Sequence, residues 1–297
     1  MEAVSENIEI FYSSDALLPY SVDIGPKKQT AHLSDLSQKF ISELQQNLQA
    51  LVDLWKTQGV SDSYMLLGVD KLQESEPFHF QAVPYESKNW VVLKVWQQFL
   101  VLWRFTFGGL GLSADRISLL DSVYTDFGDV GAQIAAKVGD ATDCAFCDNE
   151  VIDSQIVFKG RSFNILYNYA PIGLGKEKLH FLIVSKEHRP DFEMLTEEEH
   201  TEAFELSQMV TTRLQEHFTE NSLSKLYIYH KTGDEAGQSV KHWHMHLVFT
   251  QNIKQDIWGR LTVLRNILFG AIFSFRLSKE ALAKQQEKYS AILNREI

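Results

Sequence analysis

Three histidines, His242, His244 and His246, alternate with apolar residues in one short segment. Successive side chains of a β-strand point to opposite faces, so a strand here would place the three imidazoles on one face, about 6.5 to 7 Å apart. Imidazole is the usual side chain for proton transfer, nucleophilic attack and metal ligation near neutral pH. A solvent-facing polar stripe would explain one such histidine. Three in register predict a chemical surface that can engage a phosphate or a metal.

A second candidate for chemistry is the pair Cys144 and Cys147, which are the 2 cysteines of the chain. So few cysteines exclude a disulfide framework. The spacing leaves a redox dithiol, half of a zinc site, or two unrelated buried thiols. Acidic and amide neighbours, including Asp143, Asp148 and Asn149, would raise the pKa of a thiol and so disfavour the redox dithiol. We therefore favour zinc, provided that the fold supplies two further ligands.

The composition limits the classes of partner. The chain has 297 residues, of which 44% are hydrophobic and 12% aromatic, which is typical of a soluble globular protein with one large core or two ordinary ones. Its net charge of -11 argues against a broad electrostatic surface for nucleic acid or anionic lipid. Any phosphate must therefore be held by local groups.

No segment has the composition of a membrane span or a signal peptide. The most apolar region, residues 90–112, is interrupted by Lys94 and Arg104. The N-terminus is acidic and lacks a basic stretch followed by an apolar run. We expect a cytoplasmic protein that binds neither membrane nor nucleic acid.

Apolar spacing predicts two helices, over residues 34–57 and 196–218. Thr196 and Glu199 have the spacing of a capping box at the start of the second helix. Each predicted helix follows a strand-like run with a lysine-containing turn. Each precedes a second strand and then a histidine-bearing strand, and these four predicted strands are residues 63–69, 75–84, 224–230 and 239–249.

This order of elements predicts an internal repeat, with Lys28 aligned to Lys186 and His79 to His244. The first copy has Pro77, His79 and Gln81 where the second has its three histidines, and it lacks the glycine-rich approach to them. It is therefore expected to be a plain strand with one histidine. We predict a first domain over residues 1–115 and a second, with a C-terminal helical extension, over 116–297.

The segment 237–248 carries a family resemblance. Its first four residues read Gly-Gln-Ser-Val, and residues 242–248 fill all places of the pattern His-φ-His-φ-His-φ-φ, in which φ is apolar. This pattern resembles the histidine-triad (HIT) superfamily, in particular its nucleoside phosphoramidases and dinucleoside polyphosphate hydrolases. The resemblance covers residues 141–250 well and residues 15–110 as a degenerate copy. It implies an α+β fold of two HIT-like halves, each an antiparallel sheet with a packed helix.

The resemblance also implies roles for particular residues. The middle histidine, His244, would be the nucleophile that forms a nucleotidyl-histidine. His246 and the backbone N–H groups near Gln238 and Ser239 would hold the non-bridging oxygens of the phosphate. Ser239 would pass a proton to the leaving group, and His180 would support the triad from a neighbouring strand.

Substrate contacts are implied in the same way. Gly237 and Gln238 belong to the phosphate loop, and Phe146 would pack on the base. Asn168 falls where the family often has an aspartate that binds the ribose. Lys231 or His230 stands where a phosphate-contacting asparagine is usual.

Members that include the galactose-1-phosphate uridylyltransferases imply the metal ligands. In those proteins a structural zinc is held by a Cys-x-x-Cys pair, a histidine after the lysine turn, and the first triad histidine. The corresponding residues are Cys144, Cys147, His188 and His242, which would form a closed tetrahedral zinc site. Such a site would turn His242 away from catalysis.

The expected activity is hydrolysis of a nucleoside phosphoramidate or a dinucleoside polyphosphate. Nucleotidyl transfer or phosphorolysis is the alternative, although transferases of the superfamily usually have glutamine at the place of His246. The third hypothesis is a non-catalytic nucleotide-binding protein. The first copy would supply within one chain the partner surface of a HIT homodimer, and a homo-oligomer is left open.

Overall fold

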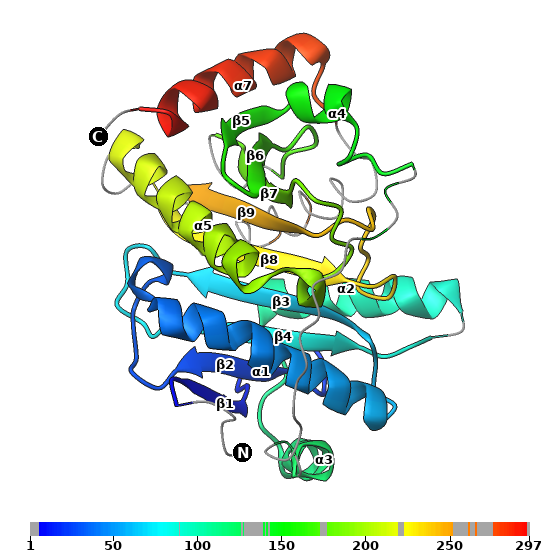
Figure 1. The fold of residues 1–297 in the computed structure, drawn as a ribbon. Coiled ribbons are helices and arrows are strands. Elements are labelled where there is room, and N and C mark those ends of the chain that lie inside the picture. Colours follow the sequence, from blue (N-terminus) through cyan, green and yellow to red (C-terminus); the bar gives the residue numbers. More distant parts are fainter. Residues whose placement is uncertain are drawn as a thin grey trace.

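An antiparallel sheet of nine strands runs through the molecule in the order β1-β2-β4-β3-β8-β9-β7-β6-β5 (Figure 1). The computed structural model describes residues 6–88, 90–125, 127, 139, 141, 143–172, 177–218, 223–251, 261, 265 and 276–295. The sheet and its helices confirm the α+β class.

The first half of the sheet is built from residues before the predicted boundary. Its elements are β1 (Ile8–Tyr12), β2 (Val22–Pro26), a short 3-10 helix (Leu33–Asp35), α1 (Gln38–Thr57), β3 (Ser63–Asp70) and β4 (Phe80–Tyr85). The second half adds β5 (Ile156–Lys159) and then β6 (Phe163–Tyr167), β7 (Leu179–Ser185), a 3-10 helix (Phe192–Met194), α5 (Glu197–His217), β8 (Leu223–Thr232) and β9 (His244–Gln251). From β1 to β4 and from β6 to β9 the order of elements is the same.

The pairing of the strands repeats as well. β1 pairs with β2, β2 with β4 and β4 with β3, as β6 pairs with β7, β7 with β9 and β9 with β8. The inner strands β3 and β8 pair with each other and join the halves into one sheet. The predicted internal repeat thus has a counterpart in the topology. That the first half is a degenerate HIT copy stays a prediction.

Helix α5 begins where the sequence predicts, whereas α1 begins at Gln38, four residues later than predicted, because residues 33–35 form a separate 3-10 helix. The Ser37 hydroxyl accepts a hydrogen bond from the backbone N–H of Phe40 at the start of α1. At the start of α5 the capping box between Thr196 and Glu199 is present in both directions. Both helices pack on the same face of the sheet (Figure 1), where they enclose the main core.

The other helices are α2 (Val91–Phe107), α3 (Ala114–Tyr124), α4 (Asn149–Asp153) and α7 (Lys279–Leu293). α2 covers the sheet face opposite α1 and α5, and α7 confirms the expected C-terminal helix. α3 belongs with the first half, because the Arg116 guanidinium donates hydrogen bonds to the backbone carbonyls of Ser13, Pro19 and Ser21. The division at residue 115 stays a prediction.

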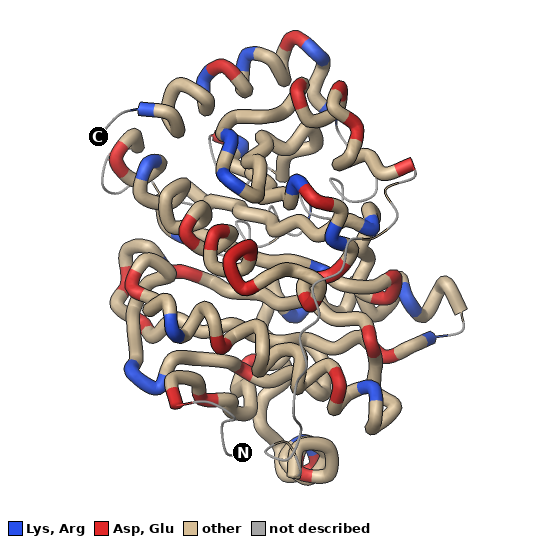
Figure 2. Tube along the Cα trace, viewed as in Figure 1, with Lys and Arg blue, Asp and Glu red and all other residues tan. Residues whose placement is uncertain are grey.

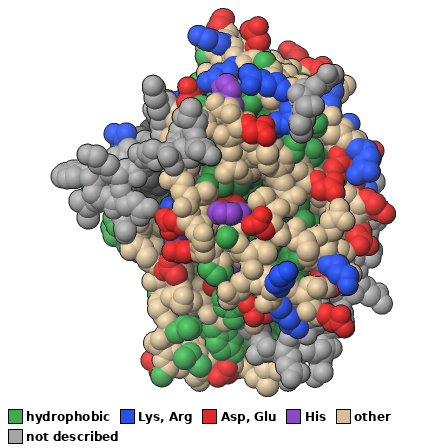
Figure 3. Space-filling view, turned by 90° about the vertical axis from the view of Figure 1, so that its left-hand side faces the viewer, with side chains coloured by type: hydrophobic (Ala, Val, Ile, Leu, Met, Phe, Trp, Pro, Cys, Tyr) green, Lys and Arg blue, Asp and Glu red, His purple; other side chains and the backbone are tan. Residues whose placement is uncertain are grey.

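Acidic and basic residues lie mainly on helices and loops, and the inner strands carry few of them (Figure 2). On the face drawn in Figure 3 the two signs are interspersed. Among the described residues no helix is both long and apolar enough to cross a membrane.

Candidate functional site

The second half of the sheet carries two triad histidines on β9. His244 and His246 lie on the sheet face that α1 and α5 leave open, with ring centroids 5.0 Å apart. Trp243, Met245 and Leu247 point the other way and are buried in the main core. The alternation of the sequence therefore places two imidazoles on one face, as predicted.

His242 departs from the predicted row of three. The strand begins at His244, not within residues 239–243, so His242 lies on irregular backbone and is fully buried. Its Nε2 lies 2.7 Å from the backbone carbonyl of Ser185, which can only accept a hydrogen bond. The ring therefore donates from Nε2 and turns Nδ1 toward the two cysteines.

Four side chains converge at that point and form a candidate metal site. The ligand atoms of Cys144, Cys147, His188 and His242 all lie within 4.8 Å of one another. The Nδ1 atom of His242 is 3.3 Å from the Cys144 sulfur and 3.5 Å from the Cys147 sulfur, and the His188 Nδ1 is 3.3 Å from the Cys147 sulfur. Sulfur and nitrogen ligands of one tetrahedral zinc ion lie about 3.6 Å apart. These four residues fit a closed tetrahedral metal site.

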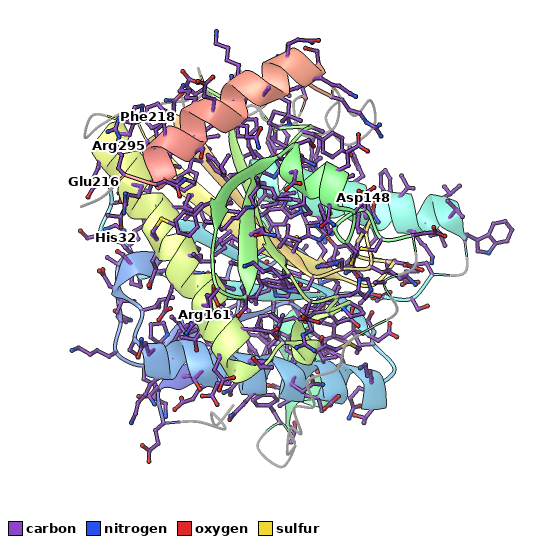
Figure 4. The ribbon with its side chains drawn as sticks, turned by 45° about the horizontal axis from the view of Figure 1, so that its top comes forward. His32, Asp148, Arg161, Glu216, Phe218 and Arg295 are labelled. Carbon is purple, nitrogen blue, oxygen red and sulfur yellow. The ribbon has the colours of Figure 1, made fainter. Side chains whose placement is uncertain are left out.

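The segment around the cysteines is held by its own local contacts. Asp148, labelled in Figure 4, accepts a hydrogen bond from the backbone N–H of Glu150 and caps α4. On the opposite side, Arg161 at the β5–β6 turn donates its backbone N–H to Glu202 of α5 at 2.6 Å. The Arg161 contact attaches the β5–β6 turn to α5.

His244 has the tautomer that a nucleophile needs. Its Nδ1 lies 2.7 Å from the backbone carbonyl of His242, so Nδ1 carries the proton and Nε2 keeps its lone pair. Burial lowers the pKa of His244, and the nearby Lys231 ammonium lowers it further. The neutral, nucleophilic imidazole is therefore the form that prevails near pH 7.

His246 is oriented by a chain of hydrogen bonds from a neighbouring strand. The backbone N–H of Ile172 donates to Nδ1 of His180 at 3.1 Å. That bond leaves Nε2 of His180 as the donor to Nδ1 of His246, 2.9 Å away. His246 therefore presents an N–H at Nε2 toward the open face. Burial keeps His180 neutral by lowering its pKa to about 3.

The glycine-rich loop before the triad is a tight turn closed by its own hydrogen bonds, since the N–H groups of Gly237 and Gln238 donate to the backbone carbonyls of Asp234 and Gly233. Gly233 and Gly237 have φ angles of 86° and 79°, a region that favours glycine. The Gln238 side chain accepts from the Gly233 N–H and donates to the Pro190 carbonyl, so it braces the loop. Ser239 is exposed at its end. The loop is also attached to α2, since Gln98 donates to the backbone carbonyl of Glu235 at 3.1 Å.

The remaining predicted binding residues fall around the same face. The Phe146 ring lies 5.0 Å from the His244 ring. The Asn168 amide contacts the His180 ring at 3.2 Å and accepts from the Ala170 N–H, so it supports His180 in this structure. Lys231 is on the triad face and influences the pKa of both triad histidines there.

His230, the alternative to Lys231, lies on the opposite face. It is buried and stacks on Phe192 with ring centroids 4.6 Å apart. Lys231 is therefore the residue that a substrate could reach. Sequence reasoning did not single out Tyr229, whose ring stacks on His246 at 4.4 Å with an interplanar angle of 7°. Tyr227, Tyr229 and Lys231 occupy every second position of β8, and this spacing could have predicted that Tyr229 shares the face of Lys231.

Comparison with known proteins agrees with this geometry. Residues 149–253 match the family model of the HIT domain. A solved uridylyltransferase superposes on the chain with a TM-score of 0.55 at 11% identity, covering 97% of this chain and 85% of that one. At such identity the likeness shows the fold alone.

Two further solved structures are more distant. A Zn-bound histidine triad family protein from Mycobacterium smegmatis has a TM-score of 0.36 at 20% identity, covering 52% of this chain and 95% of that one. An ADP-glucose phosphorylase from Arabidopsis thaliana has a TM-score of 0.43 at 10% identity, with coverages of 79% and 64%. No curated protein sequence matches the chain. Residues 149–253 therefore form a HIT domain, set in an α+β chain whose overall fold is similar to that of a solved uridylyltransferase.

Proposed function

We propose that the HIT domain cleaves a nucleoside phosphoramidate or a dinucleoside polyphosphate at the α-phosphorus through a nucleotidyl-histidine at His244. The tautomer of His244 carries this proposal. The ring donates from Nδ1 to a carbonyl and keeps a lone pair on Nε2, on the open face of the sheet. A histidine that served only as a metal ligand or a core residue would not need a free, uncharged Nε2 beside a second histidine and a lysine.

The reaction has two displacements. Nε2 of His244 attacks the α-phosphorus, the P–N or P–O bond to the leaving group breaks, and the leaving group takes the electron pair and a proton. Water then attacks the same phosphorus and the P–Nε2 bond breaks. This returns the neutral imidazole and releases the nucleoside monophosphate.

The neighbours of His244 stabilise charge and move protons in both steps. The Nε2–H of His246, the Lys231 ammonium and the backbone N–H of Ser239 would hold the non-bridging oxygens as charge builds. The hydroxyl of Ser239 would pass the proton to the leaving group. Phe146 would pack on the base. Asn168 would have to exchange its contact with His180 for one with the ribose.

We further propose that the metal site formed by Cys144, Cys147, His188 and His242 binds structural zinc. Two thiolates and two imidazoles suit zinc, and they leave no open position for water. Zinc bound there would supply rigidity by joining the segment before α4 to the backbone that precedes the triad. The fixed carbonyl of His242 is what sets the tautomer of His244.

The first half is proposed to act as a built-in partner of the HIT domain. Its repeat of the element order and the central β3–β8 pairing support this role. The contact between Gln98 of α2 and the loop supports it too, because a residue of the first half thereby steadies the proposed phosphate site.

Nucleotidyl transfer is the second candidate, favoured by the likeness of almost the whole chain to a uridylyltransferase fold. The two candidates differ in the acceptor of the second step. Adenosine phosphoramidate and a diadenosine polyphosphate should be turned over in parallel, in buffer alone, with inorganic phosphate, and with a hexose 1-phosphate. Hydrolysis predicts the nucleoside monophosphate in all three mixtures. A nucleoside diphosphate or nucleotide sugar as main product would establish transfer.

A further inference from the structure

A large apolar cavity lies on the triad face, between the sheet and α2. Its volume is about 840 Å³, within the range of sites that hold an organic ligand. Its walls come from both halves, and they include Met65 and Leu67 of β3, Tyr227 and Tyr229 of β8, and Phe99 and Leu102 of α2. Val92 and Trp96 also line it and are 75% and 55% exposed, so the cavity opens to solvent along α2.

The cavity lies beside the proposed catalytic histidines, because Tyr229 in its lining stacks on His246. Strand pairing sets one row of directly opposed residues across the sheet: Leu67, Tyr229, His246, Leu182 and Leu166. Leu67 and Tyr229 line the cavity on one side of His246. Leu182 and Leu166 form a separate buried cluster on the other side, against which Phe146 packs. His246 therefore stands between two apolar regions on the same face.

These two regions cannot serve the same part of a substrate. The cluster beside Phe146 is the side on which the proposed function places the base. An in-line displacement at phosphorus puts the nucleophile and the leaving group on opposite sides of the phosphate. The leaving group must therefore extend from the phosphate in a direction other than that of the nucleoside, and the cavity beyond Tyr229 is the space available there.

The lining determines which leaving group fits. Besides tyrosines, the polar members of the lining are Gln98 and Lys231, and none of the lining residues that the structure describes is acidic. Gln98 already donates to the Glu235 carbonyl, and Lys231 stands at the histidine end. A second nucleoside would bring hydroxyls and base edges that require partners, and each unpaired polar group would be costly. An aliphatic chain needs none and would bury its surface against Leu, Val, Met and aromatic side chains.

We infer that the leaving group of the physiological substrate carries a long alkyl chain that occupies this cavity. The substrate would then be a nucleotide joined through its phosphate to an aliphatic group. This inference rests on the proposed function and narrows its substrate class. Lys231, which is half-buried and lines the cavity, would lie where the phosphate meets the apolar chain.

The test uses adenosine 5′-phosphoramidates of methylamine, butylamine, octylamine and dodecylamine at concentrations below micelle formation. The leaving amines have nearly equal basicity, so differences in kcat/KM report on the chain. In each case the P–N bond breaks and the amine leaves with a proton. We expect kcat/KM to rise by up to about fourfold per methylene until the cavity is filled.

A variant that fills the cavity tests whether the dependence of kcat/KM on chain length arises there. Leu102→Trp places a large side chain in the cavity, and Val91→Trp adds the same side chain on the same helix at an exposed position outside the lining. Leu102→Trp should abolish most of the preference for long chains, so that kcat/KM for the dodecyl compound falls toward that for the methyl compound. Val91→Trp should keep the preference. Thermal unfolding of both variants confirms that they are folded.

A binding measurement separates this inference from the proposed function. Calorimetry with dodecyl phosphate and methyl phosphate on the His244→Ala variant needs no turnover, and a negative heat-capacity change marks burial of the chain. Chain-dependent binding that is lost in Leu102→Trp, with no turnover of any compound, would overturn the proposed function and support the cavity. Turnover without dependence on chain length would overturn the inference alone. So would a dimer that buries the cavity and blocks dodecyl phosphate.

Discussion

The two halves share a topology but use the same face of the sheet differently. In the second half the half-buried ring of His246 lies 2.9 Å from a ring nitrogen of the buried His180. In the first half His79 lies just before β4, is 44% exposed at its side chain, and has the Asp23 carboxylate 3.6 Å away. One half therefore pairs neutral imidazoles, and the other pairs an imidazole with an acid.

The residues near His79 hold a loop of the first half in place. The Gln81 amide accepts from the Leu17 N–H at 3.0 Å and donates to Asp23 and to the hydroxyl of Ser13. Arg104 of α2 donates to the Leu17 carbonyl at 2.8 Å. These polar side chains of the first half hydrogen-bond to one another and to the backbone of the same half, so they have a structural role. Helix α2 of this half lines the cavity on the triad face of the second half.

The largest expected difference between the halves is in the response to loss of a histidine. His244→Ala should lower kcat/KM for a phosphoramidate by about 10⁴-fold or more, because no other group replaces the nucleophile. His79→Ala should change it less than about twofold. Steady-state kinetics with metal content measured in parallel checks both. Retention of more than a tenth of the activity by folded His244→Ala would contradict the claim that only the second half carries the nucleophile.

Removal of a metal ligand should have the second-largest effect. Cys144→Ser or Cys147→Ser should release the metal and lower the free energy of unfolding by about 4 kcal/mol. Denaturant unfolding and elemental analysis measure the two effects. Ser154→Ala is a suitable control, because it removes only an exposed hydroxyl that donates to the Val151 carbonyl and leaves all four ligands in place. Full metal occupancy in both cysteine variants would refute the zinc assignment.

The support of His246 by His180 should be worth less. His180→Ala should lower kcat by roughly 10- to 100-fold with little change in KM, since a hydrogen bond to a group that gains charge is worth about 1.5 to 3 kcal/mol. Asp23→Asn, the change at the comparable contact of the first half, should leave kcat unchanged. Equal losses in the two variants would mean that the contact serves stability and has no special part in catalysis.

The smallest expected effect is on the pH dependence of folding stability. Burial lowers the pKa of His180, His200 and His230, all in the second half, to about 3. Because these groups bind protons near pH 6.5 only when unfolded, their neutral burial favours the fold above pH 6.5, and this stability is lost as pH falls toward 3.

His200 is the best single probe of this effect. Both of its ring nitrogens lack a hydrogen-bond partner among the described residues, and it packs between Phe192 and Phe204. His200→Phe should therefore lose a few degrees less in Tm than the parent between pH 7 and pH 5. Parallel pH profiles for the two proteins would show that His200 does not contribute.

Much of this architecture could be predicted from local patterns. Helical spacing located α1 and α5, and the Thr196–Glu199 capping box is present as expected. Strand alternation placed His244 and His246 on one face. The family resemblance brought together the four candidate metal ligands, which the fold places within 4.8 Å of one another.

What the sequence did not disclose depends on register and on long-range packing. The contact of His180 with His246 follows from the pairing of Leu182 with His246, which no single strand encodes. The turn of His242 away from the row depends on the Ser185 carbonyl of another strand. α2 has no capping side chain at Trp90, and both its helical form and its place over the triad face depend on tertiary contacts. The cavity therefore had no local signal.

The most direct test of the central claim is intact-protein mass spectrometry after a rapid, acid-free quench. The protein is mixed with an adenosine phosphoramidate, and His244→Ala with unchanged metal content is the matched control. A mass gain of one nucleoside monophosphate in the parent, absent from the variant, is the predicted result. Product formation with the same adduct in His244→Ala, or with no adduct in the parent at any quench time, would contradict the nucleotidyl-histidine mechanism.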